Sequence, residues 1–243
     1  MTTETYSWVS RHTGTDMVVV RYGERGRPLV YVPTSEGDHR EFCTYGFPEV
    51  ARPWIDMGRT QVFAIDGWGP RSWFDDGLAP VERVRRYACF EKYSVEELLP
   101  WVAAVSGRAD VAAMGASYGA MVCTNWILKH PGKVGLACGF GGVYGLWHRL
   151  AGYHDLDVYY HTPLEYLPRL DDPAILSAIR ATSGLDLFAA VDDPWFDSSE
   201  RLRSALQDKG IPHRWDVWPS PADHHENWWA EQLRAFLERR FGT

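Results

Sequence analysis

Short apolar segments with the composition of β-strands alternate with helical patterns along most of this 243-residue chain. Alternation of this kind produces parallel strands joined by crossover helices. Strands are predicted at 17–22, 29–32, 61–65, 111–114, 134–138, 185–191 and 213–218. Helices are predicted at 49–57, 94–105, 118–129, 199–209 and 226–241, the second of them with a capping box that begins at Ser94. The pattern therefore predicts an α/β fold with a mostly parallel, doubly wound sheet flanked by helices.

No internal repeat, low-complexity tract or linker interrupts this pattern, so a single domain over residues 1–243 is predicted. Residues 143–183 have weaker periodicity and are expected to form an irregular, lid-like excursion. We expect this excursion to pack as a small flap whose aromatic side chains could also hold an acyl or aryl group. Its three histidines are expected to be structural, hydrogen-bonded side chains: His148, His154 and His161.

Charge and composition exclude several classes of protein. The chain has 25 Lys and Arg against 32 Asp and Glu, a net charge of −7, so it offers no general attraction for nucleic acid or an anionic membrane. The basic cluster at 83–86 is expected to be a solvated face. No segment has the roughly eighteen apolar residues that span a bilayer, and the first residues do not resemble a secretory signal. The four cysteines lack metal-ligand spacing, which favours reduced, mostly buried thiols in a cytoplasmic protein.

The most informative motif is Gly-Ala-Ser-Tyr-Gly at 115–119, between a predicted strand and a predicted helix. This context is typical of a nucleophile elbow, a strained turn that exposes a serine at a helix N-terminus. Small residues at Gly115 and Gly119 allow the strand and the helix to approach closely. The alternative is a glycine-rich turn with an inert serine, but the strand before and the helix after favour Ser117 as a nucleophile. In such elbows the backbone N–H of the next residue, Tyr118, stabilises the oxyanion.

A serine nucleophile needs a base within hydrogen-bond reach and a group that orients this base. In folds with this elbow, the acid and then the histidine follow the serine along the chain. Asp192 and Asp193 come directly after the strand at 185–191, and His224 and His225 precede the last helix. The alternative interpretation is that the two aspartates only form a turn before a proline and have no catalytic role.

A metal site at Asp223-His224-His225-Glu226 is a further alternative. Adjacent histidines do not share one face of a helix, and the spacing differs from that of helical zinc sites. No metal or organic cofactor is therefore expected.

Other segments accompany the serine motif along nearly the whole chain: Tyr-Val-Pro-Thr-Ser at 31–35, Phe-Ala-Ile-Asp at 63–66 before a Trp-containing loop, His-Pro at 130–131, His-Thr-Pro-Leu-Glu-Tyr-Leu at 161–167 and Gly-Ile-Pro-His at 210–213. With these segments the chain resembles the α/β-hydrolase superfamily, and within it the putative-esterase (esterase D-like) group of small serine esterases. The resemblance implies the α/β-hydrolase fold and a serine esterase activity.

The resemblance also implies which histidine is the base. Such esterases tend to close with His-x-Trp-x-x-Trp-x-x-x-Leu. Aligning His224 with this histidine places Trp229 and Leu233 on the later Trp and Leu, whereas His225 matches neither. His224 is therefore the expected base, and His225 is expected to flank it.

Relatives carry the acid on a Gly-x-x-Asp turn, which implies Asp193 in preference to Asp192, with Asp197 as a distant third. By analogy with the oxyanion loops of relatives, the backbone N–H of Ser35 is the expected second oxyanion donor beside that of Tyr118.

Together these residues predict a serine hydrolase that cleaves small carboxylic esters through an acyl-enzyme on Ser117. Asp193 orients His224 in this prediction. Acyl transfer to an alcohol by the same three residues is an alternative, and so is a non-catalytic binding or scaffold protein on the same fold. A homo-oligomer is left open.

Overall fold

The computed structural model describes residues 1–182 and 184–242, so Ser183, the last residue of the predicted excursion, and Thr243 lie outside the described residues. Eight strands form one sheet in the order β1-β2-β4-β3-β5-β6-β7-β8. Their bounds are Thr3–Val9 (β1), Asp16–Tyr22 (β2), Arg27–Val32 (β3), Thr60–Ile65 (β4), Ala112–Ala116 (β5), Leu136–Phe140 (β6), Leu185–Ala190 (β7) and His213–Trp218 (β8). The pairs β1–β2 and β2–β4 are antiparallel, and the other five pairs are parallel.

The mostly parallel, doubly wound sheet is thus confirmed, and each strand predicted from the sequence is present. β1 was not predicted, because most of its side chains are exposed and it lacks the apolar run of a buried strand. The aromatic rings of Tyr6 and Trp8 on this strand instead pack against Trp101 of the helix beneath it.

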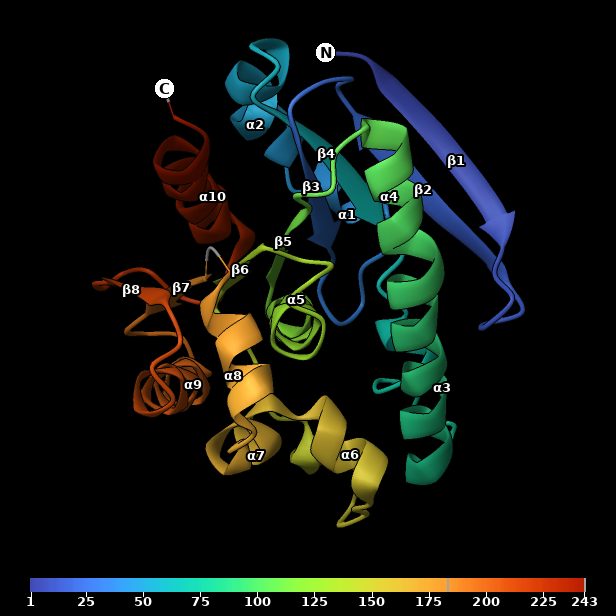
Figure 1. Ribbon diagram of the computed structural model, residues 1–243, viewed down its shortest axis with the longest axis vertical. Helices are drawn as coiled ribbons and strands as arrows, with labels where there is room; N and C mark the ends of the chain where they lie inside the picture. The colour runs from blue at the N-terminus through green and yellow to red at the C-terminus, as the bar shows by residue number, and fades with distance from the viewer. Residues whose placement is uncertain (183, 243) are drawn as a thin grey trace.

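Helices cover both faces of the sheet (Figure 1). Their bounds are Glu41–Thr44 (α1), Phe47–Asp56 (α2), Pro80–Tyr93 (α3), Leu99–Ser106 (α4), Tyr118–Lys129 (α5), Leu156–His161 (α6), Pro163–Tyr166 (α7), Pro173–Arg180 (α8), Phe196–Asp208 (α9) and Glu226–Phe241 (α10). One buried cluster lies between the sheet and α3, α4, α5 and α9, and the other lies between the sheet and α1, α2 and α10. Side chains of β3 alternate between the two clusters, as the period of a strand requires: Val30 and Val32 face the first, and Leu29 and Tyr31 the second.

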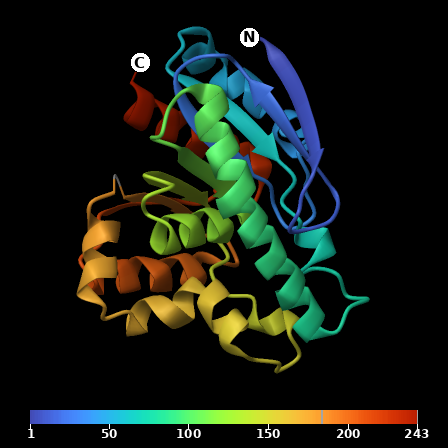
Figure 2. The ribbon, with the colours of Figure 1, turned by 45° about the vertical axis from the view of Figure 1, so that its right-hand side comes forward.

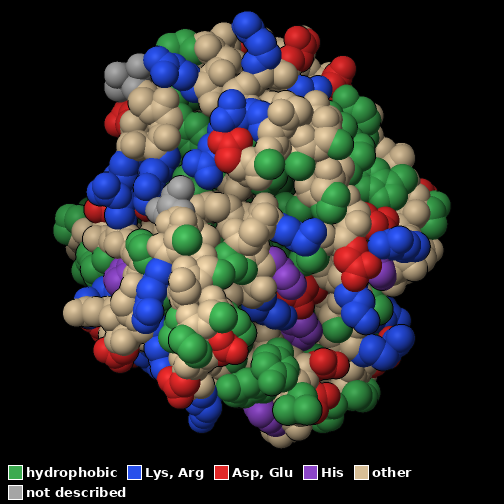
Figure 3. All heavy atoms as spheres, in the orientation of Figure 1, with side chains coloured by type: hydrophobic (Ala, Val, Ile, Leu, Met, Phe, Trp, Pro, Cys, Tyr) green, Lys and Arg blue, Asp and Glu red, His purple; other side chains and the backbone are tan. Residues whose placement is uncertain are grey.

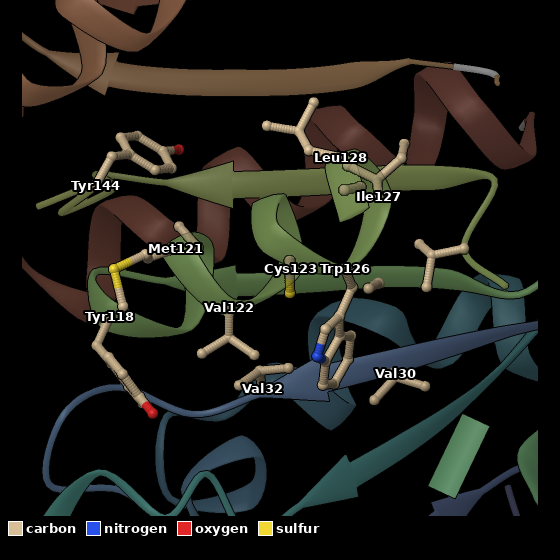
Figure 4. Packing of buried hydrophobic residues seen from close by; sticks show 14 of the residues in the cluster. Val30, Val32, Tyr118, Met121, Val122, Cys123, Trp126, Ile127, Leu128 and Tyr144 are labelled. Atoms are coloured by element: carbon tan, nitrogen blue, oxygen red, sulfur yellow. The ribbon is translucent and has the colours of Figure 1, made fainter. Parts of the chain in front are cut away.

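Helix α5 is buried along nearly its whole length. Val122 and Trp126 point from it toward Val30 and Val32 of β3 (Figure 4). This packing fixes the helix against the centre of the sheet, because β3 and β5 are neighbours there.

The capping box predicted at Ser94 is wrong. Helix α3 begins at Pro80 and continues through a π-helical turn at Ser94–Leu98 into α4, which gives one long rod (Figure 2). The hydroxyl of Ser94 is buried and donates to the carbonyl of Phe90 inside the helix, 2.8 Å away. Glu97, the other half of the predicted box, accepts hydrogen bonds from Trp8 Nε1 and Ser10 Oγ of the N-terminal segment instead.

The described part of the excursion after β6 contains the short helices α6, α7 and α8, with one turn of 3₁₀-helix before α6 and another between α7 and α8. Helix α8 begins at Pro173 with Asp172 as its N-cap, a start signal that the sequence analysis did not use. Two of the three histidines have the predicted hydrogen bonds: His154 with Glu165, and His161 with Glu91.

Two surface expectations need correction. Arg83 is buried, and its guanidinium donates to the carbonyls of Leu78 and Arg149. Val84 is also buried, and Arg85 and Arg86 form the solvated part of the basic cluster. Of the cysteines, Cys123 and Cys138 are buried, but Cys43 is exposed and Cys89 only half-buried.

Charged side chains of both signs are mixed over the face shown in Figure 3. Within the described ranges, no helix combines the length and the apolar character needed to cross a bilayer.

Glu91 ties the excursion to the body of the fold. Its buried carboxylate lies 2.6 Å from Lys129 Nζ, 2.9 Å from His161 Nδ1 and 3.3 Å from His130 Nε2. Burial by itself raises the pKa of Glu91, but the hydrogen bonds with His130 and His161 and the charge of Lys129 outweigh it, so the pKa is held below its ordinary value.

We therefore expect Glu91→Gln to lower the free energy of unfolding by about 3 kcal/mol at pH 7. Because the folded-state pKa is depressed, the stabilisation is fully present above the unfolded pKa of 4.5 and is lost as the pH falls below it. Urea unfolding of the wild type and of Glu91→Gln between pH 7 and pH 3 measures whether the difference between their free energies of unfolding shrinks as the pH falls. Glu24→Gln on the exposed surface is the control, and a difference that stays constant with pH would contradict the assignment.

Candidate active site

Ser117 lies between the end of β5 and the start of α5, with a φ of 53° and a ψ of −118°. A positive φ is rare for a residue other than glycine and costs about 1–3 kcal/mol, so the surrounding structure must hold it. Two backbone hydrogen bonds do so: Ser117 N–H donates to the Phe140 carbonyl (2.9 Å), and Val143 N–H donates to the Ser117 carbonyl (3.2 Å). The predicted strained turn is present.

The two glycines of the motif lie where no side chain fits. A Cβ on Gly115 would lie 2.5 Å from the carbonyl carbon of Gly119, and one on Gly119 would lie 2.3 Å from the carbonyl oxygen of Val32. The elbow is therefore pressed against the end of β3. The register, with Val32 opposite Gly115, brings the loop after β3 beside Ser117.

A continuous hydrogen-bond chain begins at Ser117. Ser117 Oγ lies 3.1 Å from His224 Nε2, and His224 Nδ1 lies 2.9 Å from Asp193 Oδ2. When the neutral imidazole donates its Nδ1–H to the carboxylate, the lone pair of Nε2 remains free to accept the serine proton. The structure thus brings together the three residues that the sequence analysis selected, from loops 76 and 107 residues away from Ser117 along the chain.

Asp193 is the aspartate that reaches the histidine. Its side chain is 1% exposed, and its other oxygen, Oδ1, accepts the backbone N–H of Trp195 at 2.7 Å. Asp192 and Asp197 are exposed, and Asp197 lies in the first turn of α9. The difference between the neighbours follows from the turn after β7, which points Asp193 inward.

His224 precedes α10 and packs edge to face against Trp229 of that helix, with ring centroids 5.0 Å apart. His225 is exposed and caps α10, since its Nδ1 accepts the N–H of Asn227. The flanking position predicted for His225 matches this arrangement. In the part of the chain that the structure describes, no three His, Cys, Asp or Glu side chains gather as metal ligands would.

Ser35 and Tyr118 line one cavity of about 190 Å³ together with Ser117 and His224. As the first residue of α5, Tyr118 has a backbone N–H with no acceptor within the helix. Its phenol is buried and donates to the carbonyl of Gly67, 3.2 Å away. Both backbone groups named as oxyanion donors therefore belong to residues beside the serine.

The rest of the cavity wall is mostly apolar. Phe74, Val143, Leu146, His148 and Trp195 complete the lining. The excursion contributes Val143, Leu146 and His148 to this lining, whereas Phe74 and Trp195 come from outside it. Among the rings of the excursion's described residues, the one that lines the cavity is the imidazole of His148. It stacks on Trp195 at 5.2 Å, and burial, followed by the charge of Arg149, lowers its pKa.

Phe74 and Trp195 were missed because each lies in an irregular loop without a periodic signal. For Trp195 a signal existed, since it follows the expected acid by two residues. Phe74 is held from outside by Arg149, whose guanidinium lies 5.4 Å from the ring centroid and pairs with Asp76.

Gly141 is a further residue that the sequence analysis missed. It has a φ of +52°, and a Cβ there would lie 2.5 Å from Asp193 Oδ2 and 3.2 Å from His224 Nδ1. Only a residue without a side chain leaves room for the hydrogen bond between this aspartate and this histidine.

Comparisons with known proteins give the family and the fold of the chain. A model of the family described as "Putative esterase" matches residues 61–239. A sequence search of curated proteins found no match. Among solved structures, a ferulic acid esterase is similar with a TM-score of 0.78 at 14% identity, covering 98% of each chain.

Two further structures show the same likeness. An S-formylglutathione hydrolase from Agrobacterium tumefaciens has a TM-score of 0.74 at 14% identity, with 98% of this chain and 94% of that chain covered. FphF, a fluorophosphonate-binding serine hydrolase of Staphylococcus aureus, has a TM-score of 0.74 at 12% identity, with 100% and 99% covered. At these identities the likeness concerns the fold, and it confirms the predicted α/β-hydrolase fold.

Gly141→Ala is expected to break the hydrogen bond between Asp193 and His224 and to lower the free energy of unfolding by more than backbone strain alone. Gly107→Ala is the matched control, because Gly107 also has a positive φ (+66°) but open space around its Cβ position. Strain alone costs about 1–2 kcal/mol. Urea unfolding measures both variants, and the NMR signal of the His224 Nδ1 proton reports the hydrogen bond. Equal losses of stability in the two variants and an unchanged proton signal would contradict a clash between a side chain at position 141 and the Asp193 carboxylate.

Proposed function

The chain belongs to the putative-esterase family, and from this membership we propose that it hydrolyses small carboxylic esters through an acyl-enzyme on Ser117. The observation that carries the proposal is the hydrogen-bond chain from Ser117 through His224 to the buried Asp193. A serine is a weak nucleophile by itself, and this arrangement supplies the base and the group that orients it.

In the first step Ser117 Oγ attacks the ester carbonyl carbon while its proton passes to His224 Nε2. Asp193 keeps Nδ1–H pointed toward its own carboxylate and stabilises the imidazolium that forms. The tetrahedral intermediate then expels the alcohol, which takes the proton from Nε2. The acyl group remains on Ser117 as an ester.

The negative oxygen of the intermediate needs donors that are in place before the reaction. We assign this role to the backbone N–H groups of Tyr118 and Ser35. The position of Tyr118 at the N-terminus of α5 supports the first assignment, because the helix dipole favours negative charge there. The shared cavity and the pairing of Val32 with Gly115 support the second.

Water activated by His224 then attacks the acyl-enzyme, and the carboxylic acid leaves. Acyl transfer differs only in the nucleophile, since an alcohol takes the place of water. Product analysis with added acceptor alcohols distinguishes the two, because a transferase forms a new ester at the expense of the free acid. The third alternative, a non-catalytic protein on this fold, requires that Ser117 be unreactive.

The cavity supports a small, uncharged substrate group. Phe74, Val143, Leu146 and Trp195 supply apolar walls, and among the described residues no Asp, Glu, Lys or Arg lines the cavity. The lowered pKa of His148 favours a neutral imidazole at neutral pH. The names of similar structures, a ferulic acid esterase and an S-formylglutathione hydrolase, also concern small-molecule substrates.

Mass spectrometry after incubation with a fluorophosphonate tests the nucleophile. We expect one adduct on the wild type and none on Ser117→Ala, whose ester turnover should fall by about 10⁴-fold or more.

Asp193→Asn should lower kcat by about 10³- to 10⁴-fold, because it favours the wrong imidazole tautomer. Asp192→Asn next to it is the matched control and should stay within twofold. A folded wild type that forms no adduct and cleaves no ester would favour the binding protein.

The cavity volume predicts a preference for short acyl chains. With a series of aryl esters, we expect kcat/KM to fall by at least tenfold between the butanoyl and the decanoyl ester, since a cavity of about 190 Å³ does not hold a long chain. Leu146→Ala enlarges the cavity and should reduce this ratio, whereas Val217→Ala on the exposed edge strand β8 should not. If the ratio of kcat/KM for the butanoyl ester to that for the decanoyl ester stays unchanged in Leu146→Ala, the acyl chain does not occupy this cavity.

A further inference from the structure

A buried carboxylate outside the hydrogen-bond chain of Ser117 lies behind the loop that follows β3. Glu41, the first residue of α1, is 7% exposed. Burial, the largest influence, raises its pKa against the opposing hydrogen bonds from Thr34 and Tyr31. A carboxylate in such surroundings gives little net stability, so its effect on local geometry is the more informative property.

Glu41 accepts three hydrogen bonds from only two residues. Oε1 accepts Tyr31 O–H at 2.6 Å and the backbone N–H of Thr34 at 2.8 Å, and Oε2 accepts Thr34 Oγ1–H at 2.6 Å. Thr34 is thus held at its backbone and at its side chain by one carboxylate. Hydrogen bonds to an ionised acceptor are about twice as strong as neutral ones.

The loop is also shaped to admit this carboxylate. A Cβ on Gly37 would lie 2.0 Å from Glu41 Oε2 and 2.8 Å from the Cβ of Pro33. A hydrogen bond from Gly37 N–H to the Thr34 carbonyl (3.2 Å) closes a turn over the carboxylate. Residues 33–37 therefore form a tight turn around Glu41.

Ser35 is the residue next to Thr34 and the one that reaches the cavity of Ser117. On its other side it is confined by Gly69, where a Cβ would lie 2.2 Å from the Ser35 carbonyl oxygen. The direction of the Ser35 N–H is thus set by the peptide that joins it to Thr34. Any rotation of Thr34 changes the aim of this N–H.

From these contacts we propose that Glu41 is a positioning residue that holds Thr34 and thereby aims the Ser35 N–H at the oxyanion. The proposal rests on the ester hydrolysis proposed above. A preorganised donor matters most in the transition state, where charge develops on the oxygen. Loss of Glu41 therefore lowers kcat and leaves KM nearly unchanged.

Glu41→Leu, which removes every acceptor atom, is the test variant. We expect its kcat to fall by about 10- to 100-fold, with KM within threefold of the wild type, after active sites are counted by fluorophosphonate titration. Glu41→Gln retains an amide oxygen for the Thr34 N–H and should recover most of the lost kcat.

Two control variants separate positioning from stability. Tyr31→Phe removes a hydrogen bond to the same carboxylate without touching Thr34, so it should lower the melting temperature but keep kcat within threefold. Glu97→Gln changes another part-buried carboxylate, which accepts Trp8 Nε1–H and Ser10 Oγ–H far from the cavity, and should leave kcat unchanged.

A folded Glu41→Leu protein with kcat within threefold of the wild type overturns the proposal, and so does an equal loss of kcat in Tyr31→Phe. If Glu41→Leu is unfolded at the assay temperature, Thr34→Val decides: a several-fold lower kcat supports the proposal, and a kcat within twofold of the wild type overturns it. A wild type that neither reacts with the fluorophosphonate nor cleaves esters overturns the proposed function and this inference together.

Discussion

The close approach of the Ser117 turn to the end of β3 is the constraint on which the rest of the site depends. A serine with a φ of 53° is unfavourable by itself, and it persists because Gly115 and Gly119 let α5 press against Val32. Trp126 and its neighbours on α5 supply the burial that offsets this strain. The same approach brings the loop after β3 beside the hydroxyl of Ser117. The proposed nucleophile and the proposed oxyanion loop are therefore set by one packing arrangement rather than by two.

The other parts of the site are fixed by separate local devices. The turn after β7 buries Asp193 and occupies its second oxygen with the Trp195 N–H, which leaves Oδ2 for His224. Gly141 leaves the space that this hydrogen bond needs. Glu41 holds the turn after β3. Each device fixes the local geometry, so that the groups of the proposed mechanism are in place before a substrate arrives.

The aromatic part of the cavity wall comes from loops that are far apart in the sequence. Phe74 lies in the loop after β4, Trp195 after β7 and His148 in the excursion, and these loops meet above the carboxyl ends of the parallel strands. Ligand sites of such sheets form at this edge because the loops converge there. The charge pair of Arg149 with Asp76 connects two of these loops across the cavity wall. Specificity can therefore change through loop residues while the sheet and Ser117 stay in place.

The sequence by itself determined the parallel sheet, the bounds of α5 and α10 and the turn at Ser117, because strand and helix periods and a strand–elbow–helix motif are local properties. The preference for Asp193 and His224 over their neighbours came from the resemblance to esterases. The sequence did not show that the helix containing Ser94 begins as early as Pro80. Ser94 resembles an N-cap, but its hydroxyl donates to the Phe90 carbonyl, an acceptor that only the continuous helix provides. Neither Gly141 nor Glu41 carried a local signal. Their importance arises from contacts with residues distant in sequence or across a turn, and such contacts exist only after the chain has folded. The tertiary structure alone decided which small residue and which buried carboxylate shape the site.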